Sequence, residues 1–140
     1  ELGLKNYSHV MIQQRTDAYS EDVIEILKKA TAVFFTGGDQ LRITSKIGGT
    51  PAYERIVELH KEGGVVAGTS AGASVVCTTM LVTGTSTYSH KIADVQMAPG
   101  LGLVDWAIID QHFAERGRMG RLLGSIAENP HMLGIGIDEN

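Results

Sequence analysis

The chain has 140 residues, the length of one domain or of part of one, and its 43% hydrophobic and 20% charged residues are typical of a soluble globular protein. Its formal net charge of -4 argues against general nucleic-acid binding, and no apolar run is long enough to span a membrane. The single cysteine, Cys77, excludes an internal disulfide and any metal site built from several cysteines, and we interpret it as a core residue.

Strands and helices are predicted to alternate along the chain. The first half is expected to contain a strand over 9–12, a helix over 20–30, a strand over 31–35, helices over 41–46 and 50–62, and a strand over 65–68. The second half is expected to contain a helix over 71–80, loops with a short hairpin over 83–102, a strand over 106–109, a helix over 115–128 and a strand over 132–137.

This alternation predicts an α/β fold, a three-layer sandwich with a mostly parallel sheet and helices on both faces. The chain begins without methionine and ends directly after an apolar run, so both ends look cut. We therefore expect residues 1–140 to be a segment of a single α/β domain.

A Gly-x-Ser-x-Gly pattern centred on Ser70 follows the short strand over 65–68. Strand, serine and helix in this order are typical of a nucleophile elbow, in which small residues flank the serine because the turn is sharp. The turn sets the Ser70 hydroxyl at a helix N-terminus, where free backbone N–H groups and the helix dipole favour negative charge. A serine that only caps the helix is the alternative, and this pattern alone does not separate the two.

Polar clusters follow the predicted strands, at 37–40, at Ser70, at 110–112 and at 138–139. Ligands of open parallel sheets bind outside the carboxyl ends of the strands, so we expect these clusters to share one crevice. Of the five histidines, His112 is the best candidate for a base, because it lies just past a strand end as Ser70 does. A turn histidine that binds a local carbonyl is the alternative.

The acid that would orient His112 stays open on spacing alone. Asp110, Asp138 and Glu139 all follow strands, and for Asp110 the alternative is that it fixes the loop beside His112. An acid after the last strand gives the chain order serine, histidine, acid. The α/β-hydrolases use the order serine, acid, histidine, which argues against that fold.

Acyl transfer also needs donors for an oxyanion. The N–H of Ala71 is one natural donor, and the Gly37–Gly38 turn can bring a second N–H close because glycine lets the backbone approach. Arginine forks bind carboxylates, so the arginines after His112 predict a pocket for an acidic group, with a solvated helix face as the alternative. Helical spacing puts Arg118 and Arg121 on one face without Arg116.

Five motifs together resemble one known family, the cyanophycinases. They are Thr36-Gly37-Gly38-Asp39-Gln40, Gly68-Thr69-Ser70-Ala71-Gly72-Ala73, Met97-Ala98-Pro99-Gly100-Leu101-Gly102, the segment from Asp110-Gln111-His112-Phe113 to Arg121, and Gly134-Ile135-Gly136-Ile137-Asp138-Glu139. The resemblance covers nearly the whole chain. It implies a serine peptidase related to the aspartyl dipeptidases (peptidase E), on a flavodoxin-like fold similar to class I glutamine amidotransferases. The family's first strand–helix unit and everything after Glu139 are absent here.

The resemblance also implies roles for single residues. Ser70 would be the nucleophile, His112 the base and Glu139, rather than Asp138, the acid, with Gly38 and Ala71 holding the oxyanion. The implied substrate pocket is Gln40, Asp110, Gln111, Arg116, Arg118 and Arg121.

The implied reaction is hydrolysis of cyanophycin, a poly-aspartate that bears arginine on each β-carboxyl, to β-Asp-Arg dipeptides, without metal or cofactor. We also expect a homodimer in the cytoplasm, with a secreted form as the alternative, and no nucleic-acid or membrane partner. An aspartyl dipeptidase of the peptidase E type and a non-catalytic binding protein on the same fold are the alternatives.

Overall fold

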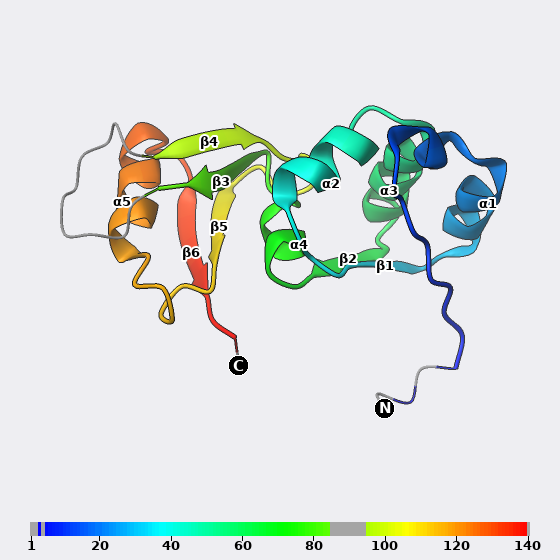
Figure 1. Cartoon of the computed structure of the whole chain (residues 1–140), viewed down its shortest axis with the longest axis horizontal. Coiled ribbons are helices and arrows are strands. Elements are labelled where there is room, and N and C mark those ends of the chain that lie inside the picture. The colour runs from blue at the N-terminus through cyan, green and yellow to red at the C-terminus, as the bar shows by residue number, and fades with distance from the viewer. Residues whose placement is uncertain (1–2, 4, 85–94, 140) are drawn as a thin grey trace.

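The computed structural model describes residues 3, 5–84 and 95–139. In chain order its elements are a 3-10 helix η1 (Arg15–Tyr19), α1 (Glu21–Lys29), β1 (Ala32–Phe35), α2 (Gln40–Ile47), α3 (Pro51–Lys61), β2 (Val65–Gly68), α4 (Ala71–Ser74), β3 (Thr79–Thr83), β4 (Gln96–Pro99), β5 (Ala107–Gln111), α5 (Met119–Glu128) and β6 (Leu133–Ile137). Figure 1 shows an elongated molecule with α1–α3, β1 and β2 at one end and α5 with β3–β6 at the other.

The helices of the first half begin where their side chains cap them. Asp39 accepts hydrogen bonds from the N–H groups of Leu41 and Arg42, so α2 begins at Gln40. Thr50 accepts from the N–H of Tyr53 at the start of α3, where proline occupies the first turn. These local signals explain why the helices of this half match the predicted ones closely.

The described strands pair two by two, and two of the three pairs are parallel. Strand β1 pairs with β2 and β5 pairs with β6 in parallel, whereas β3 and β4 form an antiparallel hairpin. The α/β class and the mostly parallel pairing are therefore confirmed. The hairpin expected within 83–102 lies partly outside that range, because its first strand, β3, begins at Thr79 in the segment predicted to be helical. Residues 85–94 of that segment, which include His90, lie outside the described residues.

The strand registers determine which polar segments lie side by side at the strand ends. Phe35 pairs with Gly68, so the turn after β1 lies beside the elbow after β2. Gln111 pairs with Ile137, so the residues after β5 lie beside those after β6. Parallel pairing thus brings together segments that are far apart in the sequence, as we expected from the strand ends.

Two clusters of buried side chains hold these elements. The larger packs η1, α1–α3 and β1 around residues such as Ile56, Met80 and Leu101. The smaller packs α5 on β3 and β5 through Leu81, Ile108 and Leu122. Burying each large aliphatic side chain contributes about 1.5–3 kcal/mol, so these clusters stabilise both parallel strand pairs. No helix among the described residues has both the length and the apolar character to cross a bilayer.

The strand predicted over 9–12 is wrong, because these residues form no strand in the structure. Their run of three consecutive apolar residues, Val10 to Ile12, is strand-like, but a strand also needs a neighbour, and no described strand pairs with this segment. Figure 1 shows the N-terminal segment running away from the body of the molecule.

The helix predicted over 71–80 is also wrong in length, since α4 ends at Ser74. The carbonyl of Val75 accepts from the N–H of Leu101 at 2.7 Å, and that of Val76 accepts from the N–H of Val104 at 2.9 Å. These carbonyls are thus taken by a distant loop, and the β-branched residues that follow favour β3 over a helix. Helix α5 likewise begins at Met119 rather than at 115, after a series of turns.

Candidate active site

The elbow after β2 holds Ser70 in a strained backbone conformation. Its φ of 54° and ψ of -123° lie in a region that non-glycine residues rarely adopt, at a cost of about 1–3 kcal/mol. Close packing on both sides enforces this turn. A Cβ at Gly68 would overlap the carbonyl of Gly72, and a Cβ at Gly72 would overlap the carbonyl of Phe35. Both glycines of the Gly-x-Ser-x-Gly pattern are therefore sterically required.

Ser70, His112 and Glu139 form a continuous chain of hydrogen bonds. The Ser70 Oγ lies 2.8 Å from the His112 Nε2, and the His112 Nδ1 lies 2.5 Å from the Glu139 Oε1. Both nitrogens of the imidazole are thus engaged, one by a hydroxyl and one by a carboxylate. A hydroxyl, an imidazole and a carboxylate in this order can activate the serine oxygen for attack on a carbonyl.

His112 reaches Ser70 through a tight turn after β5. Its φ of 50° is again left-handed. The N–H of Phe113 donates to the carbonyl of Ile137 at 3.1 Å, which ties the turn to the end of β6. A Cβ at Gly136 would lie 2.5 Å from the Phe113 ring, so glycine is needed where the ring covers β6.

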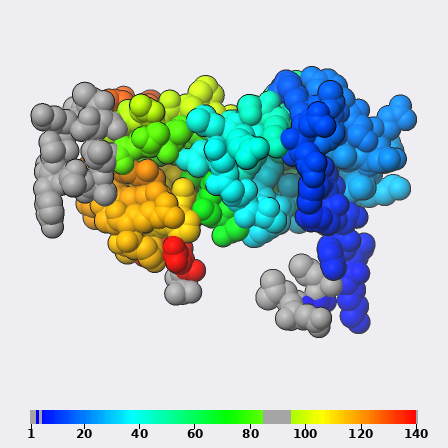
Figure 2. All heavy atoms as spheres, viewed as in Figure 1, coloured from blue at the N-terminus to red at the C-terminus, as the bar shows by residue number. Residues whose placement is uncertain are grey.

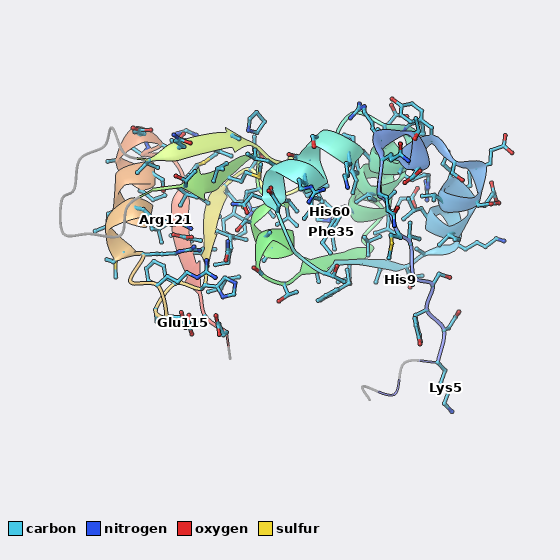
Figure 3. All side chains as sticks on the ribbon, viewed as in Figure 1. Lys5, His9, Phe35, His60, Glu115 and Arg121 are labelled. Atoms are coloured by element: carbon cyan, nitrogen blue, oxygen red, sulfur yellow. The ribbon has the colours of Figure 1, made fainter. Side chains whose placement is uncertain are left out.

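The two acids that spacing left open have different partners. The Asp138 Oδ1 accepts from the N–H of Ala114 at 2.7 Å, so this carboxylate closes the turn beside His112. Glu139 contacts the imidazole itself, and its own N–H donates to the Glu115 Oε1 at 3.3 Å. Figure 3 shows Glu115 beside the C-terminal end of the chain, and Figure 2 shows the last described residues on the surface next to the segment that leads into α5.

A cavity of about 400 Å³ opens at this point. It is lined by Gly68, Thr69, Ser70, Gln111, His112, Ile137, Asp138 and Glu139. The Gln111 Oε1 lies 3.5 Å from the Ser70 Oγ, so this amide also borders the hydroxyl. A larger hollow of about 520 Å³ lies between α2 and Gly100, but no histidine or acid lines it. The smaller cavity is therefore the candidate site.

Backbone N–H groups lie at the elbow as well. Those of Gly72 and Ala73 donate to the carbonyls of Thr69 and Ser70, but the N–H of Ala71 finds no acceptor within the described part of the chain. The turn after β1 lies against this point, since a Cβ on Gly37 would be 3.5 Å from the Ser70 Cβ.

The arginines after His112 do not behave alike. Arg121 is buried and donates to both oxygens of Asp110, which is fully buried, with Nε to Oδ2 at 2.7 Å. Arg118 lies 3.5 Å from the same carboxylate and also donates to the carbonyl of Gln111. Burial lowers the pKa of Arg118, and the charge of Arg121 lowers it further. Arg116 is exposed.

The predicted shared face of Arg118 and Arg121 is present, but it points into the fold. Figure 3 shows Arg121 on α5 over the strands. Among the residues expected to bind substrate, only Gln111 lines the cavity. Gln40 is buried, and its amide nitrogen donates to the carbonyl of Leu81 at 2.6 Å. The substrate roles of these side chains stay predictions.

Two contacts near the site were not predicted from the sequence. The first is the bond from Ala114 to Asp138, and the second is the bond from Arg118 to the carbonyl of Gln111. No sequence motif predicts either contact, because each depends on how the fold places two segments next to each other. No cluster of three or more His, Cys, Asp or Glu side chains within the described ranges is arranged to hold a metal ion.

The family model of peptidase family S51 matches residues 1–140. The chain is 44% identical to a cyanophycinase of Geminocystis herdmanii and 42% identical to one of Trichormus variabilis, matching all of this chain but 52% and 47% of theirs. It thus spans about half the length of the curated relatives it matches.

A solved structure is similar too. The crystal structure of a peptidase from an acI-B1 Actinobacterium matches 93% of this chain and 52% of its own, with a TM-score of 0.71 and 28% identity. The family match covers the strand ends at which Ser70, His112 and Glu139 meet. The chain belongs to peptidase family S51.

Proposed function

We propose that this chain carries the reactive centre of a serine exopeptidase that hydrolyses cyanophycin to β-Asp-Arg dipeptides. The observation that carries the proposal is the hydrogen-bond chain from Ser70 through His112 to Glu139 beside an open cavity. The relatives named cyanophycinase support the choice of substrate.

In the first step Ser70 Oγ bonds to the scissile carbonyl carbon while His112 Nε2 takes the hydroxyl proton. Glu139 accepts the hydrogen bond of Nδ1–H, which fixes the imidazole and stabilises its charged form. The carbonyl oxygen becomes an oxyanion, for which the N–H groups of Ala71 and Gly38 are the proposed donors. Removing one such donor typically lowers kcat about 10²- to 10³-fold.

In the second step the carbon–nitrogen bond breaks and His112 gives its proton to the leaving amine. The acyl group now sits on Ser70. Water then attacks this ester while His112 takes a proton from the water, and the proton returns to Ser70 as the acid product leaves. The hydroxyl and the neutral imidazole are thereby regenerated.

The substrate carries both a carboxylate and a guanidinium in every unit, so a site with groups of both signs suits it. Asp138 and Glu139 line the cavity, and Arg116 lies exposed on the turn after His112. Charged hydrogen bonds from these groups would hold the two ends of a β-Asp-Arg unit. A homodimer and a cytoplasmic location stay predictions.

The experiment compares Ser70→Ala with Ser45→Ala, an exposed serine whose hydroxyl bonds only its own helix. Release of dipeptides from cyanophycin granules is measured by mass spectrometry, together with labelling by a fluorophosphonate. We expect no release and no label in Ser70→Ala, and wild-type values in Ser45→Ala. Turnover retained in Ser70→Ala would overturn the proposal.

The same assays separate the two alternatives. A wild-type chain that takes the label and cleaves free aspartyl dipeptides but not the polymer would be a dipeptidase. A wild-type chain that binds the polymer without taking the label would be a binding protein. Arg116 is the arginine to replace when the substrate pocket is tested, because Arg118 and Arg121 also hold Asp110.

A further inference from the structure

The last two residues of β5 are held by the arginines that follow His112. The carboxylate of Asp110 is fully buried and is bound at both oxygens by Arg121. The carbonyl of Gln111, the residue directly before His112, accepts a hydrogen bond from the Arg118 Nη1. The side chain of Arg118 is only 11% exposed, so most of it lies inside the fold.

Charge alone does not explain Arg118. Arg121 already forms a two-pronged ion pair with Asp110, and such a pair neutralises one carboxylate. A second guanidinium at 3.5 Å adds a positive charge that burial disfavours, as the lowered pKa of Arg118 reflects. The distinctive contact of Arg118 is therefore its hydrogen bond to the backbone of Gln111.

That bond acts on a residue with an unusual backbone. His112 has a φ of 50°, a conformation that an L side chain adopts only when its surroundings enforce it. On its C-terminal side the turn is tied by Phe113 to Ile137 and by Ala114 to Asp138. On its N-terminal side Arg118 fixes the preceding peptide group.

We propose that Arg118 is a positioning residue, which holds the Gln111 carbonyl and thereby keeps the His112 ring aimed at Ser70. This inference rests on the proposed function, and it assigns Arg118 a role other than contact with substrate. The cavity lining agrees, since Gln111 and His112 border the cavity and Arg118 does not. A shift of about 1 Å in a reacting group is enough to lower a rate about a hundredfold.

The test measures how fast phenylmethylsulfonyl fluoride inactivates Ser70 in wild type, Arg118→Met and Arg118→Lys. This reagent has neither carboxylate nor guanidinium, so its rate reports the alignment of Ser70 and His112 and is indifferent to a substrate pocket. We expect Arg118→Met to react about 10- to 100-fold more slowly, with kcat for dipeptide release reduced alike and KM within twofold. Arg118→Lys, which keeps a cationic donor, recovers part of the rate.

Arg42→Met is the control, because Arg42 is an exposed arginine of α2 that does not line the cavity, and its reagent rate is expected to stay at the wild-type value. A wild-type reagent rate in Arg118→Met with a raised KM would overturn the inference and assign Arg118 to substrate. If Arg118→Met does not fold, the folded Arg118→Lys decides in the same way: a slower rate supports positioning, and an unchanged rate overturns it. A wild-type chain that never reacts would instead overturn the proposed function.

Discussion

The elbow after β2 and the turn after β5 solve the same problem by different means. Each ends a parallel strand with a left-handed non-glycine residue, Ser70 or His112, and they are the only such residues in the described ranges. At the elbow, backbone against backbone enforces the conformation, since Gly68 and Gly72 leave no room for a side chain. At the turn, side chains such as Arg118 and Asp138 enforce it through hydrogen bonds. The elbow is thus held by close backbone packing, which includes the carbonyl of Phe35 in β1, and the turn is held by hydrogen bonds from side chains.

The largest expected effect comes from cutting the link between imidazole and acid. Glu139→Gln keeps the shape but offers Nδ1 an amide in place of a carboxylate, so we expect kcat to fall about a thousandfold, roughly 4 kcal/mol of transition-state stabilisation. Asp138→Asn is the comparison variant, because it keeps the oxygen that accepts from the N–H of Ala114 and leaves His112 bonded to Glu139. We expect a much smaller fall in kcat, with any lost contact to substrate seen in KM. Steady-state dipeptide release measures both. Equal losses in the two variants would contradict the assignment of the acid.

Gly68→Ala tests the elbow after β2, where backbone packs against backbone. The added Cβ meets the carbonyl of Gly72 and cannot move away, so we expect a loss of about 3 kcal/mol or more in the free energy of unfolding. Gly124→Ala in α5 is the control, since among the described residues its Cβ would meet only the Val95 side chain, at 3.1 Å, and alanine favours a helix. Urea unfolding followed by circular dichroism measures both. Stability close to wild type in Gly68→Ala would show that the elbow is not held by close packing.

Arg121→Met tests the end of β5, where side chains hold the backbone. Asp110 then loses its two-pronged partner in a fully buried place, which we expect to cost about 3 kcal/mol of stability. The double variant Asp110→Asn with Arg121→Met removes both charges and should recover part of that loss, as urea unfolding can measure. A double variant less stable than Arg121→Met alone would speak against the ion pair as the cause.

The smallest effect concerns Cys77, which follows α4 below the elbow. Burial raises the pKa of its thiol. The unfolded chain therefore releases this proton at lower pH than the folded one, so stability falls as pH rises through the ordinary range of thiol titration. We expect unfolding experiments between about pH 7 and about pH 9.5 to show this loss in wild type and to lack it in Cys77→Ala. The same slope in both would assign the loss to other groups.

The contrast between the two ends explains what the sequence could predict. The elbow is written in five consecutive residues, so Ser70 and the flanking glycines were predicted from the sequence. His112 was predicted because it follows a strand, and ligands of parallel sheets bind at the carboxyl ends of strands. This rule can be applied without knowing any tertiary contact. The choice between Asp138 and Glu139 as the acid stayed open on spacing alone. It depends on Asp138 bonding Ala114 while Glu139 bonds His112, and these contacts join the ends of two different strands.

Other misses have the same cause. The helix over 71–80 was overextended because the donors that take the carbonyls of Val75 and Val76 come from Leu101 and Val104, more than twenty residues on. The inward pairing of Arg121 could not be predicted either. It depends on Asp110 facing α5, which is set by packing rather than by spacing.

The most direct test of the central claim is to map the residue that a fluorophosphonate modifies. We expect one adduct in the wild-type chain, on the peptide that contains Ser70. We expect none above background in His112→Ala at equal time, with an unchanged far-ultraviolet spectrum. Labelling of another serine, or equal labelling of Ser70 without the imidazole, would contradict it.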